Sequence, residues 1–244
     1  ARPASRAHLR WPWLTAALLT CLVSCLVSAA SPAQAKPAPA HDEVLLLGSS
    51  SVLGALGHRF EHELERLGVD VRAHGRSSSG LARPDFFDWF GRAKSLPLSK
   101  RTRAAVVYVG GNDAQGIRLR GAKERKHYKA KDRWLRWQHP RWAAAYADRV
   151  QEFASTLCRR GVRRVVFVTP AAVSSPWLQR RLIRIRKAIG RGASKVRCAH
   201  VVSSGNDAVS KARERRRGAK RLRGPHGTHL SRIGAERLWR RMGT

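Results

Sequence analysis

The sequence predicts one α/β domain built on a parallel sheet that carries helices on both faces. Three observations predict this class. Short apolar runs that stop at Gly or Pro recur along the chain, segments with helical spacing of apolar residues alternate with them, and the connections are short. The chain has 244 residues and is 43% apolar, enough for one sizeable core. This composition excludes a disordered chain and one filled with membrane spans.

The apolar runs define about five strands, and the periodic segments define the helices between them. We expect strands at 43–48, 69–73, 104–109, 163–169 and 199–203. We expect helices at 52–67, 141–160, 177–189 and 231–242, with a short aromatic helix or turn at 84–95. Because β-α-β units with short connections place their strands parallel, both faces of the sheet are expected to be covered.

A basic insertion at about 117–140 interrupts this alternation. It follows the third strand at its carboxyl end, where open α/β sheets bind their ligands. Trp134 and Trp137 stand among Arg residues here; Trp rings stack on sugars or bases, and Arg pairs with carboxylates or phosphates. The two Trp residues are therefore candidates to line a substrate site. The alternative is a lipid-facing or core-facing helix edge with solvated Arg.

The charge of the chain is strongly positive. Lys and Arg total 49 against 16 acidic residues, which gives a formal net charge of +33. Such a surface attracts polyanions, so an anionic polysaccharide or a membrane surface is an expected partner. Nucleic acid is a weaker expectation because no reading motif is present. The alternative is a basic composition with no bound polyanion, since the charge is spread along the whole chain.

Residues 1–35 resemble an export signal. Arg2, Arg6 and Arg10 precede an apolar run that ends near Ala30, and Ala33-Gln34-Ala35 matches an A-x-A cleavage site. A Pro/Ala-rich tether at 36–42 then leads into the domain at 43–244. Lipoprotein processing at Cys25 and an uncleaved anchor are the alternatives. In each case we expect the domain to be periplasmic or extracellular.

Two cysteines, Cys158 and Cys198, remain in the domain after the expected cleavage. In an oxidising compartment two cysteines can form one disulfide. Two free buried thiols are the alternative.

Four short blocks place chemically active residues after strands or before the last helix. They are Gly48–Ser51, His74–Gly80, Gly110–Asp113 and His226–Leu230. A Ser at a helix N-terminus can serve as a nucleophile, although it is also a common helix cap. Gly and Asn can supply the hydrogen-bond donors of an oxyanion hole, and a His can act as general base.

The order and spacing of these blocks resemble the SGNH (GDSL-type) hydrolase superfamily. The stretch from Ser79 to Trp89, together with Trp142, Tyr146 and Arg149, is similar to a group of exported bacterial SGNH proteins classed as a domain of unknown function. The resemblance implies a flavodoxin-like three-layer α/β/α sandwich and serine-ester hydrolysis without a cofactor or metal. The residue roles that it implies are nucleophile Ser50, base His229, and oxyanion donors Ser50, Gly80 and Asn112.

Two positions depart from the superfamily pattern. Ser49 stands where the first block has Asp, which is a mild change. His226 stands where an Asp would orient the base, and loss of that carboxylate can cost several orders of magnitude in rate. A Ser–His dyad is the expected arrangement if the chain is active. Asp85, Asp88 and Trp89 are candidate substrate-lining residues; their alternative roles are capping and packing.

The favoured hypothesis is an exported esterase or acyltransferase that acts on O-acyl groups, acetyl in the simplest case, of a cell-envelope carbohydrate. The alternative is a catalytically degenerate protein of the same fold that binds an anionic envelope glycan.

Overall fold

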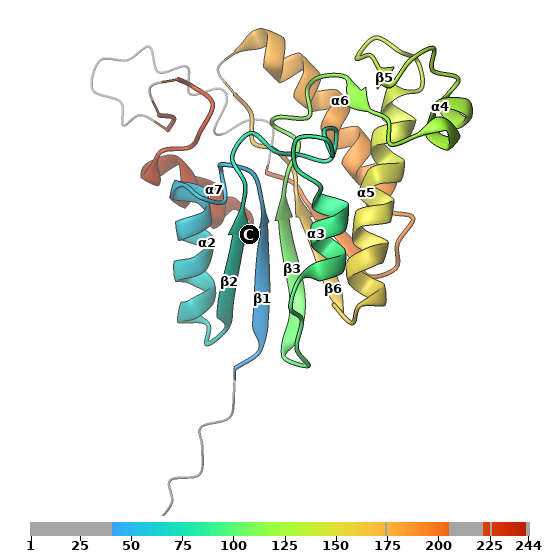
Figure 1. The fold of residues 1–244 in the computed structure, drawn as a ribbon. Helices are drawn as coiled ribbons and strands as arrows, with labels where there is room; N and C mark the ends of the chain where they lie inside the picture. The colour runs from blue at the N-terminus through green and yellow to red at the C-terminus, as the bar shows by residue number, and fades with distance from the viewer. Residues whose placement is uncertain (1–40, 174, 205–221, 225, 243–244) are drawn as a thin grey trace, which may run out of the picture. The chain divides into compact units, whose positions relative to one another are not determined.

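The computed structural model describes residues 41–173, 175–204, 222–224 and 226–242. The expected signal segment and most of the tether lie outside these residues. Five parallel strands form the central sheet in the order β2-β1-β3-β6-β7 (Figure 1). Their bounds are β1 Glu43–Gly48, β2 Asp70–Gly75, β3 Thr102–Tyr108, β6 Arg164–Val168 and β7 Ala199–Val202. This is the flavodoxin-like order, in which the chain direction across the sheet reverses between β1 and β3.

Helices cover both faces of the sheet, as the sequence predicts. One face carries α2 Ala55–Arg66 and α7 Arg232–Met242; the other carries α3 Trp89–Ser95, α5 Trp142–Arg159 and α6 Pro176–Ala193 (Figure 1). The apolar run of β1 is buried along its whole length because it lies inside the sheet. Leu45 and Leu47 pack into the core under α5, and Leu46 packs into the core under α2 and α7. The three-layer fold class is confirmed.

No helix within the described residues is long and apolar enough to span a membrane.

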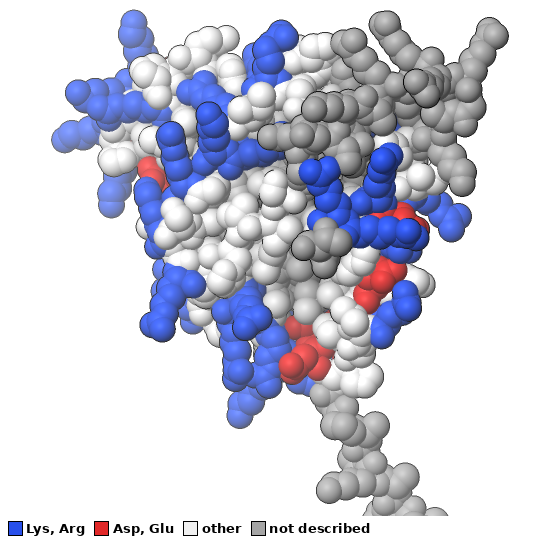
Figure 2. All heavy atoms as spheres, turned by 180° about the vertical axis from the view of Figure 1, so that it is seen from behind, with Lys and Arg blue, Asp and Glu red and all other residues white. Residues whose placement is uncertain are grey.

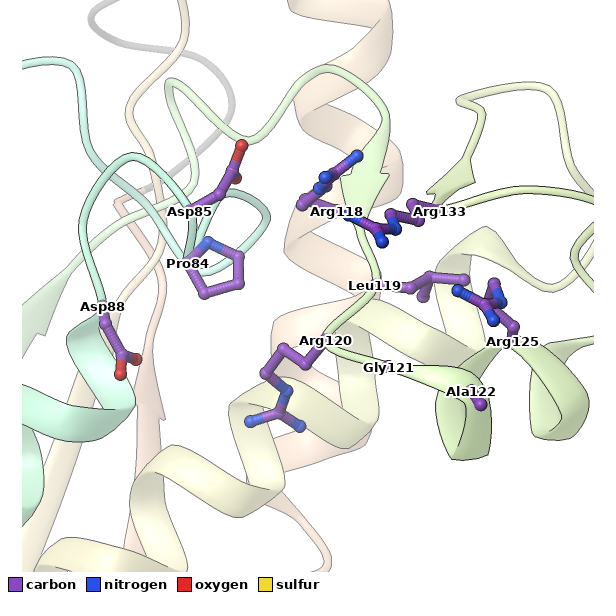
Figure 3. Close-up of a pocket in the computed structure, with 10 residues that line it drawn as sticks. All are labelled: Pro84, Asp85, Asp88, Arg118, Leu119, Arg120, Gly121, Ala122, Arg125 and Arg133. Atoms are coloured by element: carbon purple, nitrogen blue, oxygen red, sulfur yellow. The ribbon is translucent and has the colours of Figure 1, made fainter.

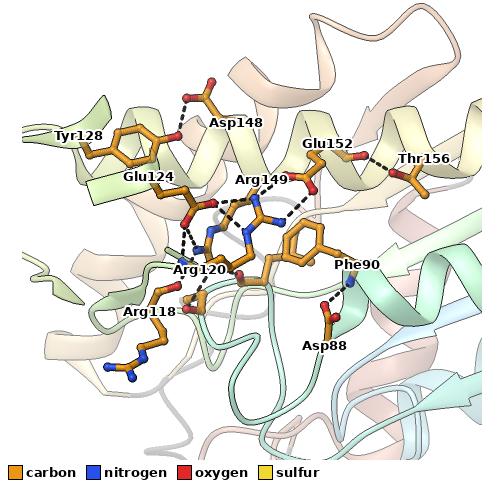
Figure 4. A network of polar contacts seen from close by, with 12 residues as sticks. Asp88, Phe90, Arg118, Arg120, Glu124, Tyr128, Asp148, Arg149, Glu152 and Thr156 are labelled. Carbon is orange, nitrogen blue, oxygen red and sulfur yellow. Dashed lines mark hydrogen bonds and ion pairs between the residues drawn. The ribbon is translucent and has the colours of Figure 1, made fainter. Parts of the chain in front are cut away.

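The basic insertion is ordered and held to α5. It contains β4 Ile117–Arg118 and β5 Trp134–Leu135, which pair antiparallel, and the short helix α4 Ala122–Tyr128. Arg120 donates to both carboxylate oxygens of Glu152 on α5, at 2.8 and 2.7 Å, and to Glu124 at 2.7 Å (Figure 4). Tyr128 donates to Asp148 at 2.9 Å. These contacts hold the insertion against the middle of α5.

A disulfide joins Cys158, near the end of α5, to Cys198, which lies just before β7. Their Cα atoms are 6.4 Å apart. The pairing links the helical layer to the outermost strand of the sheet.

Candidate active site

The ends of three neighbouring strands bring the sequence blocks to one edge of the sheet. Gly48 at the end of β1 is in register with Gly75 of β2 and Tyr108 of β3. Ser50 follows β1 by two residues, and Asn112 follows β3 by four. Ligands of open α/β sheets bind at this edge, where the strand order reverses.

Ser50 and His229 are in direct contact. The Oγ atom of Ser50 lies 2.8 Å from Nε2 of His229, although 179 positions separate them in the sequence. The segment before α7 holds the imidazole in place. Its Leu230 is buried in the core under α2 and α7 and bridges to Arg223, and the carbonyl of His229 accepts a hydrogen bond from Gly224 N–H at 3.0 Å.

A small pocket of about 170 Å³ opens at this contact. Its lining includes Tyr108 and Arg223 beside the two contact residues. Tyr108 is buried, which raises the pKa of its hydroxyl. That hydroxyl accepts a hydrogen bond from the backbone N–H of Ala171 at 2.9 Å. The floor of the pocket is therefore fixed by β3 and by the loop after β6.

Ser50 does not stand at a helix N-terminus, which corrects an expectation from the sequence. The predicted helix at 52–67 begins at Ala55, and residues 49–54 form a turn closed by a 2.9 Å hydrogen bond from Val52 N–H to Ser49 C=O. Because helix-dipole effects fall off within the first turn, α2 cannot be counted as the main activator of the Ser50 hydroxyl. The nearby imidazole is the group that can take its proton.

The second ring nitrogen of His229 has no hydrogen-bond partner within the described part of the chain. His226 does not supply one, because its side chain is exposed and only its carbonyl oxygen is engaged, by Thr228 Oγ1 at 3.3 Å. His226 is therefore not a base-orienting residue in this structure. The arrangement is a serine–histidine pair without a third member.

Hydrogen-bond donors for an oxyanion are available at the same edge of the sheet. Within the described ranges, the backbone N–H groups of Ser50 and Gly80 donate to no protein acceptor. Asn112 uses Nδ2 to donate to Ser79 C=O at 3.0 Å, which leaves its second N–H for a ligand. Gly80 has to be glycine, because a Cβ there would lie 2.2 Å from Oδ1 of Asp113.

Asp113 is a structurally important residue that the sequence did not single out. It is buried, and it accepts hydrogen bonds from Ala82 N–H and from the Tyr146 hydroxyl, each at 2.7 Å. Burial raises the pKa of its carboxyl group. The carboxylate sits directly behind Gly80 and fixes the loop that would present the Gly80 N–H.

The residues Trp142, Tyr146 and Arg149 brace the same loops from α5. Trp142 donates from its indole to Gln115 C=O at 2.8 Å, and Arg149 donates to Leu81 C=O at 2.8 Å. Arg149 also reaches the carbonyl of Arg118, at 2.6 Å, so it joins the Gly80 loop to the insertion (Figure 4). The three residues are spaced four and three apart, which places them on one face of the helix. That spacing is the sequence pattern from which their supporting role could have been predicted.

Trp89 belongs to the core and does not line a pocket, so the structure shows the packing alternative for this residue. Its side chain is 2% exposed, and its indole donates to Ser79 Oγ at 3.0 Å. The aromatic ring therefore supports the loop from beneath. Asp88 caps α3 by accepting from Phe90 N–H at 3.0 Å.

The other candidate lining residues lie away from the Ser50 pocket. Asp85 and Asp88 line a second pocket, described below. The guanidinium carbons of Arg83 and Arg118 lie 4.9 and 5.2 Å from the ring centroid of Trp134. Trp137 packs against Trp142, with ring centroids 4.3 Å apart.

Within the described ranges, no group of three His, Cys, Asp or Glu side chains is placed to hold a metal ion.

The geometry above defines the class: a flavodoxin-like α/β/α sandwich with Ser50, Gly80, Asn112 and His229 in this chain order at the carboxyl edge of its sheet. The family follows from comparison of sequences. Residues 43–243 match the model of DUF459, described as a protein of unknown function, and the chain belongs to this family. A search of curated proteins finds no significant sequence match.

Solved structures with a similar fold include several esterases. A catalytic mutant of Axe2, an acetylxylan esterase from Geobacillus stearothermophilus, is 12% identical, with a TM-score of 0.51 and coverage of 82% of this chain and 93% of that one. LAE5, an α/β hydrolase from the metagenome of Lake Arreo, is 12% identical, with a TM-score of 0.50 and coverage of 84% and 94%. A protein from Slackia heliotrinireducens assigned to the SGNH hydrolases is 17% identical, with a TM-score of 0.49 and coverage of 83% and 96%. The likeness to Axe2 and LAE5 shows that this chain shares their fold.

Proposed function

We propose that this chain is an exported serine esterase or acyltransferase that acts on O-acyl groups, most simply acetyl, of a cell-envelope carbohydrate. The observation that carries the proposal is the 2.8 Å contact between Ser50 Oγ and His229 Nε2 at the carboxyl edge of the sheet. A nucleophile within hydrogen-bond reach of a base is the arrangement that acyl transfer needs.

The chemistry proceeds in two halves. His229 Nε2 takes the Ser50 proton while Oγ bonds to the carbonyl carbon, and the negative charge moves to the carbonyl oxygen. The N–H groups of Ser50, Gly80 and Asn112 are the donors available to stabilise that oxyanion. The C–O bond to the sugar then breaks, and the imidazolium returns its proton to the leaving oxygen. Water or a second hydroxyl attacks the acyl-enzyme by the same steps in reverse.

Three observations support the choice of substrate and location. The Ser50 pocket is small, which suits a short acyl group. Axe2, which has a similar fold, is an acetylxylan esterase. The disulfide between Cys158 and Cys198 suits an oxidising compartment, in agreement with the expected export signal at 1–35.

The test is hydrolysis of p-nitrophenyl acetate by the domain and by its Ser50→Ala variant. We expect the variant to lose roughly 10³-fold or more in kcat/KM, because the nucleophile is removed. Labelling by a serine-directed fluorophosphonate should disappear with it. A Ser51→Ala variant is the matched control, since it changes the neighbouring hydroxyl in the same turn and should stay active and labelled. Equal rates and no labelling in all three proteins would overturn the proposal.

One observation favours a second candidate, a protein of the same fold that only binds an anionic glycan. The Nδ1 atom of His229 lacks an acceptor within the described residues, so nothing there stabilises an imidazolium. Absent turnover and absent labelling, combined with measurable glycan binding, would support this candidate instead.

A further inference from the structure

A second pocket, of about 590 Å³, lies between the loop that follows Gly80 and the basic insertion (Figure 3). Pro84, Asp85 and Asp88 form one wall. The facing wall consists of residues 118–122 with Arg125 and Arg133. The volume falls in the range of small-molecule sites. This pocket shares no lining residue with the Ser50 pocket.

Two charged groups of this pocket, Arg120 and Asp85, already have oppositely charged partners within the protein. Arg120 is held by Glu124 and Glu152. Asp85 accepts two hydrogen bonds from Arg83, at 2.9 and 3.0 Å, which lower the pKa of its carboxyl group. Because these groups are neutralised in pairs, they do not determine which ligand charge the pocket prefers.

Three guanidinium groups in the same wall are not neutralised. Arg118, Arg125 and Arg133 make no side-chain hydrogen bond or ion pair with an acidic group in the described part of the chain. Arg118 stacks on Trp134 and adds a small electrostatic contribution to the lowered pKa of Asp85, which Arg83 dominates. Figure 3 shows the three side chains on one side of the pocket, across from Asp85 and Pro84. Like charges held together in a concave surface concentrate a positive potential there, and an anion relieves their repulsion.

We propose that this pocket binds an anionic sugar residue of a polysaccharide, with its carboxylate or phosphate on Arg118, Arg125 and Arg133. Arg matches both anions because its planar fork can donate two parallel hydrogen bonds. Asp88 faces the same space and uses one carboxylate oxygen to cap α3, so its other oxygen can accept from a sugar hydroxyl. The proposal rests on the proposed function only for the expectation that the ligand is a carbohydrate.

The test measures binding directly, in Ser50→Ala protein, so that its result does not depend on hydrolysis. The variant is Arg125→Gln/Arg133→Gln. The matched control is Arg163→Gln/Arg164→Gln, which removes the same charge from two exposed Arg residues at the opposite edge of the sheet. Probes at an ionic strength near 0.15 M are polygalacturonate for carboxylate, phosphomannan for phosphate, neutral dextran, and double-stranded DNA. Thermal melting checks that both variants are folded.

We expect the pocket variant to bind polygalacturonate, phosphomannan or both about tenfold more weakly or worse, and the control to change by less than about twofold. The polysaccharide whose binding weakens in the pocket variant shows whether the pocket recognises a carboxylate or a phosphate. Dextran should bind neither protein. Equal losses in the two variants, an equal loss for DNA, or no binding of either anionic glycan would overturn the proposal. Loss of esterase activity in the separate Ser50→Ala experiment leaves this result unaffected.

Discussion

Ser50 and His229 come from opposite ends of the domain, and their contact depends on the residues around His229. Leu230 anchors the segment in the core under α2 and α7. The imidazole is thus placed by backbone contacts, and no carboxylate within the described residues orients it. Residue 226 is the position at which the superfamily pattern supplies that carboxylate.

His226 gives the first prediction at this scale. Because its exposed ring makes no hydrogen bond to Ser50 or His229, His226→Ala should leave the esterase kcat within about twofold. His226→Asp restores the carboxylate of the superfamily pattern and should raise kcat by about tenfold or more, since an acceptor stabilises the imidazolium. His226→Asn is the control that matches Asp in shape without its charge. A large loss in the Ala variant would show that His226 has a catalytic role.

Asp113 gives a prediction on pH dependence. Its folded-state pKa is raised by burial, so the folded protein retains a proton that the unfolded chain releases. The Asp113 contribution to the free energy of unfolding is therefore constant at low pH and falls as the pH rises from about 4 through the raised pKa. Asp113→Asn should remove this fall, measured by urea unfolding between pH 4 and 8.

Asp85→Asn is the matched control for that measurement. The pKa of Asp85 is lowered by Arg83, so its contribution has the opposite sign: it is present above about pH 4 and is lost as the pH falls through the lowered pKa. The Asp85 side chain is 35% exposed, so its contribution to the pH dependence of stability should be small. A stability difference between wild type and Asp113→Asn that does not change with pH would contradict the assignment.

The order of the four sequence blocks predicted Ser50, Gly80, Asn112 and His229 as site residues, because each block follows a strand or precedes the last helix. For Trp89 the sequence left two environments open, a pocket lining and the core, and the structure shows the core. An aromatic residue beside Asp looks the same in a sequence whether it lines a pocket or packs beneath a loop. Asp113 was passed over because its partners, Ala82 and Tyr146, are about thirty residues away.

At the scale of elements, the bounds of segments with a clear apolar pattern could be predicted from the sequence. The polar helix α4 could not. The five strands of the sheet lie within about two residues of their predicted bounds, since buried parallel strands need continuous apolar runs. Helix α4 was not predicted, because only Tyr128 of its seven residues is buried. Its position depends instead on ion pairs with α5, which leave no periodic signal in the sequence.

The disulfide gives the prediction at this scale. It closes a loop with a sequence separation of 40 between α5 and β7. Replacing Cys158 and Cys198 by Ala should lower the free energy of unfolding by about 2–5 kcal/mol, measured by urea denaturation. Reductant should lower the melting temperature of the wild type and leave the variant unchanged. Equal stability of the two proteins without reductant would show that the bond adds nothing.

At the scale of the whole molecule, positive charge covers several parts of the surface. Figure 2 shows Lys and Arg side chains over much of one face, with few acidic groups between them. General attraction of polyanions follows from a net charge of +33 and weakens with salt. The second pocket differs because it gathers guanidinium groups in one concavity, which can select among the anions that the surface attracts.

The expected export signal and the disulfide can be tested together in the same purified protein. The full chain, produced in a bacterial host, should be recovered outside the cytoplasm with an N-terminus near Lys36 by intact mass. Cleavage there removes Cys21 and Cys25, so Cys158 and Cys198 are the cysteines that remain. Because these two are paired, the mature protein should show no free thiol before reduction and two after it. A lipidated N-terminus at Cys25 would instead establish a membrane-anchored form, and an intact chain in the cytoplasm with free thiols would contradict export.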